Sequence, residues 1–317
     1  MTPFGPFVKL GIGFLRKALI EQAKRYSIGL ALAAGMLASV GCAVRRETRI
    51  QPSQLPSPPR QATLSELVAL LKSRSEAVET LTATVDLEPT AGSIYSGVIK
   101  EYHDVKGFIL LERPSTLRMQ GLAPVVRTEI FDMVAKGEDF RLYIPPKQKF
   151  IVGKTTLSRP AKNSLENLRP QHILDALLIP EVDPGHDQVF PEEAEENGRY
   201  YYVLTIVESP SEGGLRLERK VWFDRSDLEV ARAQFYSPQG NYIEDVRYSE
   251  YQDFQGTRYP GRIEVNRPIE DYHLTITLLK ATFNQPIAPD KFDLEKPEGA
   301  QLVDLTAKAP QESPRDQ

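Results

Sequence analysis

The sequence predicts a mainly β fold of the α+β class, a large curved antiparallel sheet that forms an incomplete barrel of about 11 strands, with helices packed on its concave side. Three observations lead to this prediction. Runs of β character, broken by turn residues, dominate the chain after residue 81. Helical periodicity is found in only two stretches. Short connections between the runs favour antiparallel neighbours.

The first predicted helix begins after Thr63. Thr63 and Glu66 have the spacing of a capping box, in which each side chain bonds to the other residue's backbone N–H. The apolar residues that follow have the spacing of one helical face: Leu64, Leu67, Val68, Leu71 and Val78. We therefore expect an amphipathic helix at the start of the folded part.

The strands are predicted from alternating or β-branched runs. Before the second helical stretch these runs lie at 82–87, 95–103, 107–112, 116–120, 127–135, 139–144 and 150–152. The helical stretch itself covers 164–178, with a break at Pro170. β character returns at 199–208, 215–224, 230–236, 242–251, 262–266 and 272–282.

Several strands are apolar on both faces. In 201–207 one alternating set is Tyr201, Val203 and Val207, and the other is Tyr202, Leu204 and Ile206. A sheet that is covered on one face needs only one such set, so a helix on the concave side would account for the second. Either a filled core or an apolar cavity between sheet and helix fits this pattern.

The chain before the folded part has the composition of an export signal and a tether. A basic leader precedes the apolar run 28–41, which has the length and flanks of a signal-peptide core and is short for a membrane-spanning helix. Residues 43–62 are rich in proline, serine and glutamine. We predict a signal peptide at 1–41, a tether at 42–62, a folded domain at 63–306 and a disordered tail at 307–317.

Cys42 is the only cysteine of the chain. Ser39-Val-Gly-Cys42 resembles the lipobox of bacterial lipoproteins, apart from Ser39, where leucine is usual. The resemblance implies that Cys42 is diacylated and becomes the new N-terminus, each buried methylene contributing about 0.8 kcal/mol to membrane binding. Ala43 then implies the periplasmic face of the outer membrane, with the inner membrane as an alternative. An uncleaved anchor with a buried thiol remains the other interpretation.

The charge of the chain argues against nucleic acid as a partner. It has 43 acidic and 39 basic residues, and loss of the leader removes five basic residues and one acidic residue. A mature chain with a more negative net charge and no basic stripe does not suit a phosphate backbone.

The strand motifs resemble the outer-membrane lipoprotein-sorting family, the LolA/LolB-like proteins. The segments that carry the resemblance are 107–120 (GFILLERPSTLRMQ), 121–125, 128–133, 136–145 (KGEDFRLYIP) and 289–300 (PDKFDLEKPEGA). The resemblance implies a half-barrel with helices as a lid over a hydrophobic cavity for acyl chains.

The family pattern also assigns roles to residues. It implies that Arg113 holds the lid through hydrogen bonds to backbone carbonyls, for which a guanidinium with five donors is suited. It implies that Leu122 lies in the loop that contacts cargo or membrane. Tyr143 and Trp222 are candidates to line the cavity, although aromatic residues in strands are more often plain core. The resemblance implies acylated lipoproteins or lipids as partners.

The sequence offers no motif for catalysis, metal binding or a cofactor. His103, His172, His186 and His273 lack metal-ligand spacing, and nucleophile elbows and phosphate loops are missing. The segment 183–187 (DPGHD) has turn composition, and 192–196 (EEAEE) is interpreted as a solvated acidic patch. We therefore expect a non-enzymatic, membrane-anchored binder of acyl chains in lipoprotein sorting or envelope lipid handling. The alternative is a structural lipoprotein that scaffolds an envelope complex and has no ligand cavity.

Overall fold

The computed structural model describes residues 58–91, 100–101, 105–124, 126–155, 169–210 and 213–306. All of them belong to one compact unit, Ser57–Gln317, which contains every strand and core residue that is described. The predicted signal peptide, Cys42, most of the tether and the tail 307–317 lie outside the described residues.

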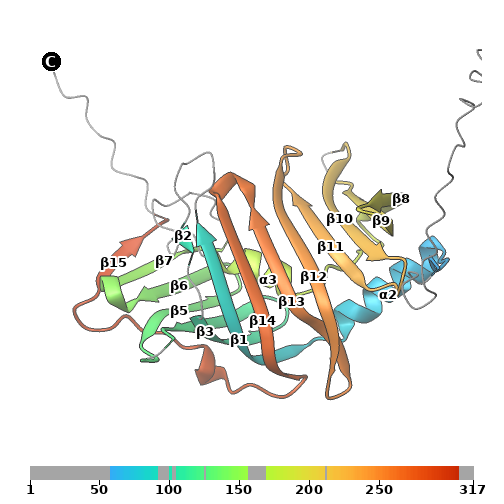
Figure 1. Ribbon diagram of the computed structural model, residues 1–317. Coiled ribbons are helices and arrows are strands. Elements are labelled where there is room, and N and C mark those ends of the chain that lie inside the picture. The colour runs from blue at the N-terminus through green and yellow to red at the C-terminus, as the bar shows by residue number, and fades with distance from the viewer. Residues whose placement is uncertain are drawn as a thin grey trace, which may run out of the picture. The chain divides into compact units, whose positions relative to one another are not determined.

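A single sheet, with 15 strands among the described residues, forms the body of the unit (Figure 1). Fourteen strands follow the order β15-β7-β6-β5-β4-β3-β1-β14-β13-β12-β11-β10-β9-β8, and β2 pairs with β1. Neighbouring strands are antiparallel, with the exception of β15, which is parallel to β7. Because the order ends at β15 on one side and at β8 on the other, the barrel is incomplete, and the predicted fold class is confirmed.

The strands have these bounds: β1 Thr80–Ala91, β2 Lys100–Glu101, β3 Val105–Glu112, β4 Thr116–Leu122, β5 Glu129–Lys136, β6 Asp139–Ile144, β7 Lys149–Lys154, β8 Asp187–Glu196, β9 Arg199–Glu208, β10 Arg216–Asp224, β11 Val230–Tyr236, β12 Tyr242–Phe254, β13 Thr257–Arg267, β14 Tyr272–Phe283 and β15 Gln301–Asp304. The helices are α2 Leu64–Glu76 and α3 Pro170–Leu177, with short 3-10 turns η2 Pro145–Lys147, η4 Pro268–Glu270 and η5 Pro289–Phe292.

Two of the strands were not predicted, and the described sheet therefore exceeds the expected count of about 11. β8 contains Pro191 and four glutamates, and pairs only with β9 at an edge of the sheet. β15 has four residues, none of them fully buried. An edge strand pairs with one neighbour and is covered little by other elements, so it needs few apolar residues. Its composition can therefore resemble that of a loop.

The concave side of the sheet is filled by one continuous apolar core. Both helices contribute to it, through Leu67 and Leu71 of α2 and through Ile173, Leu174 and Leu177 of α3. Its largest fully buried side chains include Tyr259, Phe140 and Phe223. Of the two alternatives, a filled core or an apolar cavity between sheet and helices, the described residues form a filled core on the concave side.

A second, smaller core lies on the opposite face of the sheet. The segment after β14 crosses strands β5 to β7 and buries Phe292, Leu294 and Ala300 against Val134 and Phe150. Apolar residues on both faces of some strands therefore have two causes: helices cover the concave face, and the C-terminal segment covers part of the convex face.

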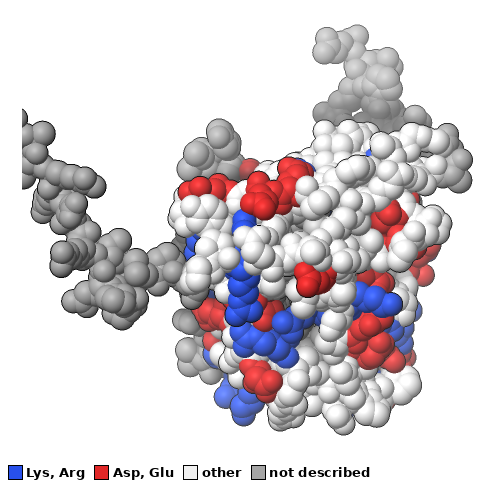
Figure 2. All heavy atoms as spheres, turned by 90° about the vertical axis from the view of Figure 1, so that its right-hand side faces the viewer, with Lys and Arg blue, Asp and Glu red and all other residues white. Residues whose placement is uncertain are grey.

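Charged side chains alternate in sign near the β8 end of the sheet. Figure 2 shows acidic and basic groups next to one another on this side of the molecule. Arg225 lies 2.7 Å from Glu193, and Lys220 lies 3.4 Å from Glu192. The acidic run of β8 is thus partly neutralised by cations of the following strands.

Candidate ligand-binding site under the two helices

Helix α2 begins with the predicted capping box. The backbone N–H of Glu66 donates to Thr63 Oγ1 at 3.3 Å, and the backbone N–H of Thr63 donates to Glu66 Oε2 at 2.7 Å. The helix then buries Leu67, Leu71 and Ser75 on the sheet. The local sequence signal and the packing agree on where this helix starts.

Arg113 fastens the C-terminal end of α2 to the sheet. It follows β3, and its Nε donates to the carbonyl of Val78 at 2.7 Å. Its Nη2 donates to the carbonyl of Ser75 at 2.7 Å and to Ser75 Oγ at 2.9 Å. Ser75 lies in the last turn of α2 and Val78 just after the helix, so one guanidinium binds the carbonyl groups on both sides of the helix end.

Helix α3 starts at Pro170 and packs its apolar face on the concave side. Proline fits the first helical position because its missing N–H would have no partner there. Ile173, Leu174 and Leu177 are buried, and the hydroxyl of Tyr259 donates to the carbonyl of Leu177. At the N-cap, the guanidinium of Arg169 lies 5.9 Å from the centre of the Phe140 ring.

Charged residues are buried between α3 and the sheet. Glu244 of β12 and Arg267 of β13 are 1% and 6% exposed, and Arg267 Nη1 donates to Glu244 Oε2 at 2.6 Å. Arg267 also bonds to Glu270 through two contacts, at 2.8 and 3.1 Å. From α3, His172 Nδ1 lies 2.9 Å from Glu244 Oε2 and 2.5 Å from Arg267 Nη1. With Asp175 one turn further along α3, these residues form what we call the α3 cluster.

Burial shifts the proton affinities of the α3 cluster. It raises the pKa of Glu244 to about 7, although the charge of Arg267 opposes this rise. It raises the pKa of Asp175 to about 7, with a further contribution from Glu244. It lowers the pKa of His172 to about 3, and Arg267 acts in the same direction. Near neutral pH the cluster therefore holds a neutral histidine and carboxyl groups close to their titration midpoint.

A pocket of about 410 Å³ opens beside α3. Its apolar lining includes Leu174, Leu178, Phe235 and Ile243. Asp175 lines it too, so the pocket reaches the α3 cluster. Ligand pockets in proteins have volumes of about 300 to 1,000 Å³, so this one, which we call the α3 pocket, is large enough for part of an elongated ligand.

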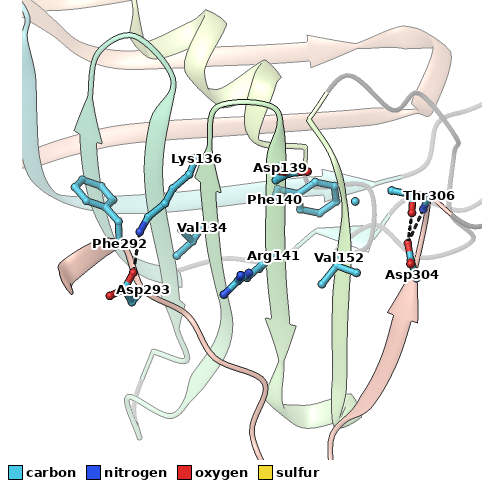
Figure 3. Close-up of a pocket in the computed structure, with 11 residues that line it drawn as sticks. Val134, Lys136, Asp139, Phe140, Arg141, Val152, Phe292, Asp293, Asp304 and Thr306 are labelled. Carbon is cyan, nitrogen blue, oxygen red and sulfur yellow. Dashed lines mark hydrogen bonds and ion pairs between the residues drawn. The ribbon is translucent and has the colours of Figure 1, made fainter. Parts of the chain in front are cut away.

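A second pocket, of about 490 Å³, lies under the C-terminal segment on the convex side (Figure 3). Lys136 bonds to Asp293 at 2.7 Å across it, and Arg141 donates to the carbonyl of Leu294 at 2.9 Å. Since these contacts attach the segment to β5 and β6, they account for the charged lining of this pocket as part of the fold.

Arg113 and Leu122 have different surroundings in the structure. Arg113 contacts the end of α2. Leu122 is the last residue of β4 and is half-buried, paired with Lys106 and Glu129. Among the described residues of the turn between β4 and β5, Val126 has an apolar side chain that is 73% exposed. Strand pairing keeps Leu122 against the sheet, whereas Val126 lies beyond the last pair.

Tyr143 and Trp222 lie on the convex face and do not line the concave side. Tyr143 packs at 6.5 Å from Phe150 in the smaller core. Trp222 lies 5.6 Å from Tyr201 and donates from Nε1 to Gln234 at 2.9 Å. In both strands the residues on either side point into the concave core, and alternation places the aromatic ring opposite.

The histidines lie apart. His186 is exposed in the turn 184–186, where it bonds to Asp183 at 2.9 Å, and His273 contacts Thr275 at 3.3 Å. His103 and Cys42 lie outside the described residues. In the part of the chain that the structure describes, no three His, Cys, Asp or Glu side chains are grouped so as to hold a metal ion. None of the described helices has the length and hydropathy of a membrane span.

The structure is similar to several solved structures at low sequence identity. A LolA superfamily protein from Nitrosomonas europaea has 14% identity and a TM-score of 0.44, over 72% of this chain and 97% of that one. A putative outer membrane lipoprotein-sorting protein domain from Vibrio parahaemolyticus has 13% identity and a TM-score of 0.47, over 72% and 95%. A DUF1329 family protein from Desulfovibrio piger has 12% identity and a TM-score of 0.49, over 74% and 98%.

No family model matches the sequence, and no curated protein matches it. At such identities and TM-scores the structural matches carry no information about ligand or activity.

The α3 cluster was not predicted from the sequence. Two features of the sequence could have indicated it. The first is that His172 and Asp175 lie three residues apart on a helix that is otherwise apolar towards the sheet. The second is that Glu244 and Arg267 occupy inward positions of their strands, in line with Val246 and Val265. A charge at an inward position is a sign of a specific partner, because an unpaired buried charge is costly.

Proposed function

We propose that the protein is an envelope lipoprotein that binds acyl chains of lipids or lipoproteins between its two helices and the concave face of the sheet. The observation that carries the proposal is the construction of this face. It is mainly apolar, and among the described residues its cover consists of helices of 13 and 8 residues. Polar contacts hold this cover in place, from Arg113 to the end of α2 and from Tyr259 and Arg267 to α3.

Acyl chains are a suitable replacement for such a cover. If α2 and α3 move away, the apolar surface beneath them needs another apolar partner, and the hydrophobic effect that favours this exchange has no directional requirement. The α3 pocket gives the chain an entry beside Leu178 without prior unfolding of the sheet. Binding in this way requires movement of the cover, because the core is filled when the helices are in place.

Further parts of the proposal concern the anchor, which lies outside the described residues, and the contacts of the lid and of one turn. The lipobox-like sequence before Cys42 supports a lipid anchor on that thiol, at the periplasmic face of the outer membrane. In this proposal Arg113 holds the lid closed, and the turn with Leu122 and Val126 contacts cargo or membrane. No step of it requires catalysis.

A titration with a fluorescent hexadecanoic acid tests the proposal on the compact unit, residues 57–317. We expect saturable binding with about one probe per chain. The substitution Leu178→Glu places a charge in the α3 pocket and should weaken binding at least about tenfold, since the carboxylate must be desolvated. Leu215→Glu is the matched control, because Leu215 is 63% exposed and lies outside the pocket.

The filled concave core favours a second candidate function, a structural lipoprotein that scaffolds an envelope complex. Tyr259, Phe140 and Phe223 are fully buried there by other residues of the protein. The same titration separates the two candidates. Absence of saturable probe binding, or equal binding by Leu178→Glu and the parent protein, would contradict the acyl-binding proposal and favour the scaffold.

A further inference from the structure

The contact between α3 and the sheet brings His172 against the Glu244 carboxyl. Arg267 Nη1 lies 2.5 Å from His172 Nδ1, and a guanidinium only donates, so the Nδ1 lone pair faces Arg267 as the acceptor. The same Nδ1 lies 2.9 Å from Glu244 Oε2, and a carboxylate oxygen and a nitrogen lone pair repel each other at this distance. A proton on the Glu244 carboxyl lowers the repulsion, because Oε2 then carries no full negative charge and still accepts from Arg267.

Protonation also decides the charge of the cluster. With Glu244 and Asp175 protonated and His172 neutral, the positive Arg267 and the negative Glu270 cancel. When both carboxyl groups ionise, two negative charges are added between α3 and the sheet, where Arg267 already pairs with Glu270. Glu244 is 1% exposed, and its Oε1 has no hydrogen-bond partner among the described residues, so water does little to screen its charge.

Of the other groups around the cluster, Arg169 is the one whose positive charge acts on His172. Tyr248 and Tyr272 are buried, and burial raises the pKa of both hydroxyls, so they stay neutral. Arg169 lies at the N-terminal end of α3, against Phe140. The titratable and charged groups that act on the cluster are Arg169 at the N-cap of α3, His172 and Asp175 on α3, Glu244, Asp245 and Tyr248 on β12, Arg267 on β13, Glu270 on η4 and Tyr272 on β14.

We infer that α3 is a pH-sensitive lid, which the α3 cluster holds against the sheet when it is protonated and releases when its carboxyl groups ionise. This inference rests on the proposed function, because release of α3 uncovers the same apolar face that the acyl chain is proposed to occupy. It adds a means of control to that site.

The direction of the pH effect follows from the two carboxyl groups. Their raised pKa values, about 7, belong to the closed lid, while a solvated lid has ordinary carboxyl values. Protons therefore stabilise the closed state, and this contribution is lost as the pH rises through 7. His172 has the opposite effect below its ordinary pKa of 6.5. Burial disfavours protonation of this histidine, so protons at His172 favour the open lid. The net change in the opening equilibrium between pH 6 and pH 8.5 is on the order of tenfold.

Thiol labelling of Ala176→Cys measures the opening of α3. Ala176 is fully buried on the helix, and residues 57–317 contain no other cysteine. The labelling rate is divided by that of a free cysteine peptide at each pH, which corrects for the thiolate fraction. We expect the corrected rate to rise about tenfold from pH 6 to pH 8.5. The rise should disappear when Glu244→Gln and Asp175→Asn are added, because neither side chain then ionises.

Two controls make the result specific to α3. Asp132→Asn removes a buried carboxylate that pairs with Arg118 on the convex side, and should leave the pH response of Ala176→Cys intact. Ala300→Cys, in the smaller core, reports opening of the rest of the fold and should show no comparable rise. A corrected rate at Ala176→Cys that is independent of pH, or an equal rise at Ala300→Cys, would contradict the inference that α3 is a pH-sensitive lid.

The hexadecanoic acid titration at pH 6 and pH 8.5 separates this inference from the proposed function. A pH-dependent rate without probe binding at either pH contradicts acyl binding and leaves the lid in place. Probe binding with a labelling rate that does not respond to pH refutes the lid and leaves acyl binding in place.

Discussion

Arg113 illustrates how one side chain can determine the position of an element. Its guanidinium reaches two backbone carbonyls and one hydroxyl at the end of α2, while its own backbone N–H bonds to the carbonyl of Glu79 at 3.0 Å. The planar fork of arginine allows these contacts at the same time, whereas lysine offers a single ammonium group.

The substitution Arg113→Lys should therefore lower the free energy of unfolding. We expect a loss of about 1 to 3 kcal/mol, because charge-assisted bonds to partly buried carbonyls are lost. Chemical denaturation of residues 57–317 measures it. Arg127→Lys is the control, since Arg127 is exposed in the turn after β4. An equal effect of both substitutions would show that Arg113 makes no special contribution.

Aromatic side chains show the limit of prediction for single residues. Tyr143 and Trp222 are flanked by apolar neighbours in both directions, so composition does not tell which alternating set faces the helices. The register of the sheet decides it, and both rings face away from α2 and α3.

Among the elements, α2 has its start encoded most locally. Thr63 and Glu66 satisfy each other's backbone N–H groups, and Glu66 carries a pKa lowered by its hydrogen bonds with Thr63. The cap requires no contact from the rest of the chain, which is why the sequence predicts it.

Removal of this cap should destabilise the unit. Thr63→Ala is expected to cost about 1 kcal/mol of unfolding free energy, since it leaves helical N–H groups without a partner. Thermal and urea unfolding of residues 57–317 measure the loss. Ser73→Ala, at an exposed position inside the same helix, should cause no loss. If both variants lose the same stability, the cap does not contribute.

The edge strands β8 and β15 are elements that only the sheet explains. β8 owes its place to backbone pairing with β9 and to ion pairs such as Arg232 with Glu196 at 3.7 Å. β15 returns to β7 after the C-terminal segment has crossed the convex face. A chain with this composition becomes a strand because a neighbouring strand offers unpaired N–H and C=O groups.

At the scale of the whole molecule, an open sheet covered by two short helices is combined with a proposed lipid anchor. In this proposal the anchor would bring the apolar site close to a membrane, and the proline-rich stretch 43–62 would allow the folded unit to stand away from it.

Cys42→Ser tests the anchor. We expect the substituted protein to leave the membrane fraction and to lose incorporation of a palmitic acid analogue, because the thioether-linked chains are absent. Cell fractionation and mass spectrometry of the N-terminal peptide measure these changes. Ser53→Ala, in the tether, should have no effect. If Cys42→Ser stays in the membrane fraction to the same extent, an uncleaved leader is the anchor.

The sequence by itself determined the features that depend on near neighbours. It gave the start of α2 and the bounds of β6 and β11, because caps, turns and alternation act over a few residues. It also gave the fold class, since many short β runs with few helices leave little other than a curved antiparallel sheet.

Only the tertiary structure decided which faces and charges meet. His172 and Arg267 are 95 residues apart in the chain, and their contact exists because α3 lies across β12 and β13. The faces of Tyr143 and Trp222 and the pairing of β8 and β15 depend on the same sheet order. Such contacts join residues that are far apart in the chain, and they form when the fold brings the ends of a long segment together. A pattern over a few neighbouring residues therefore cannot predict them.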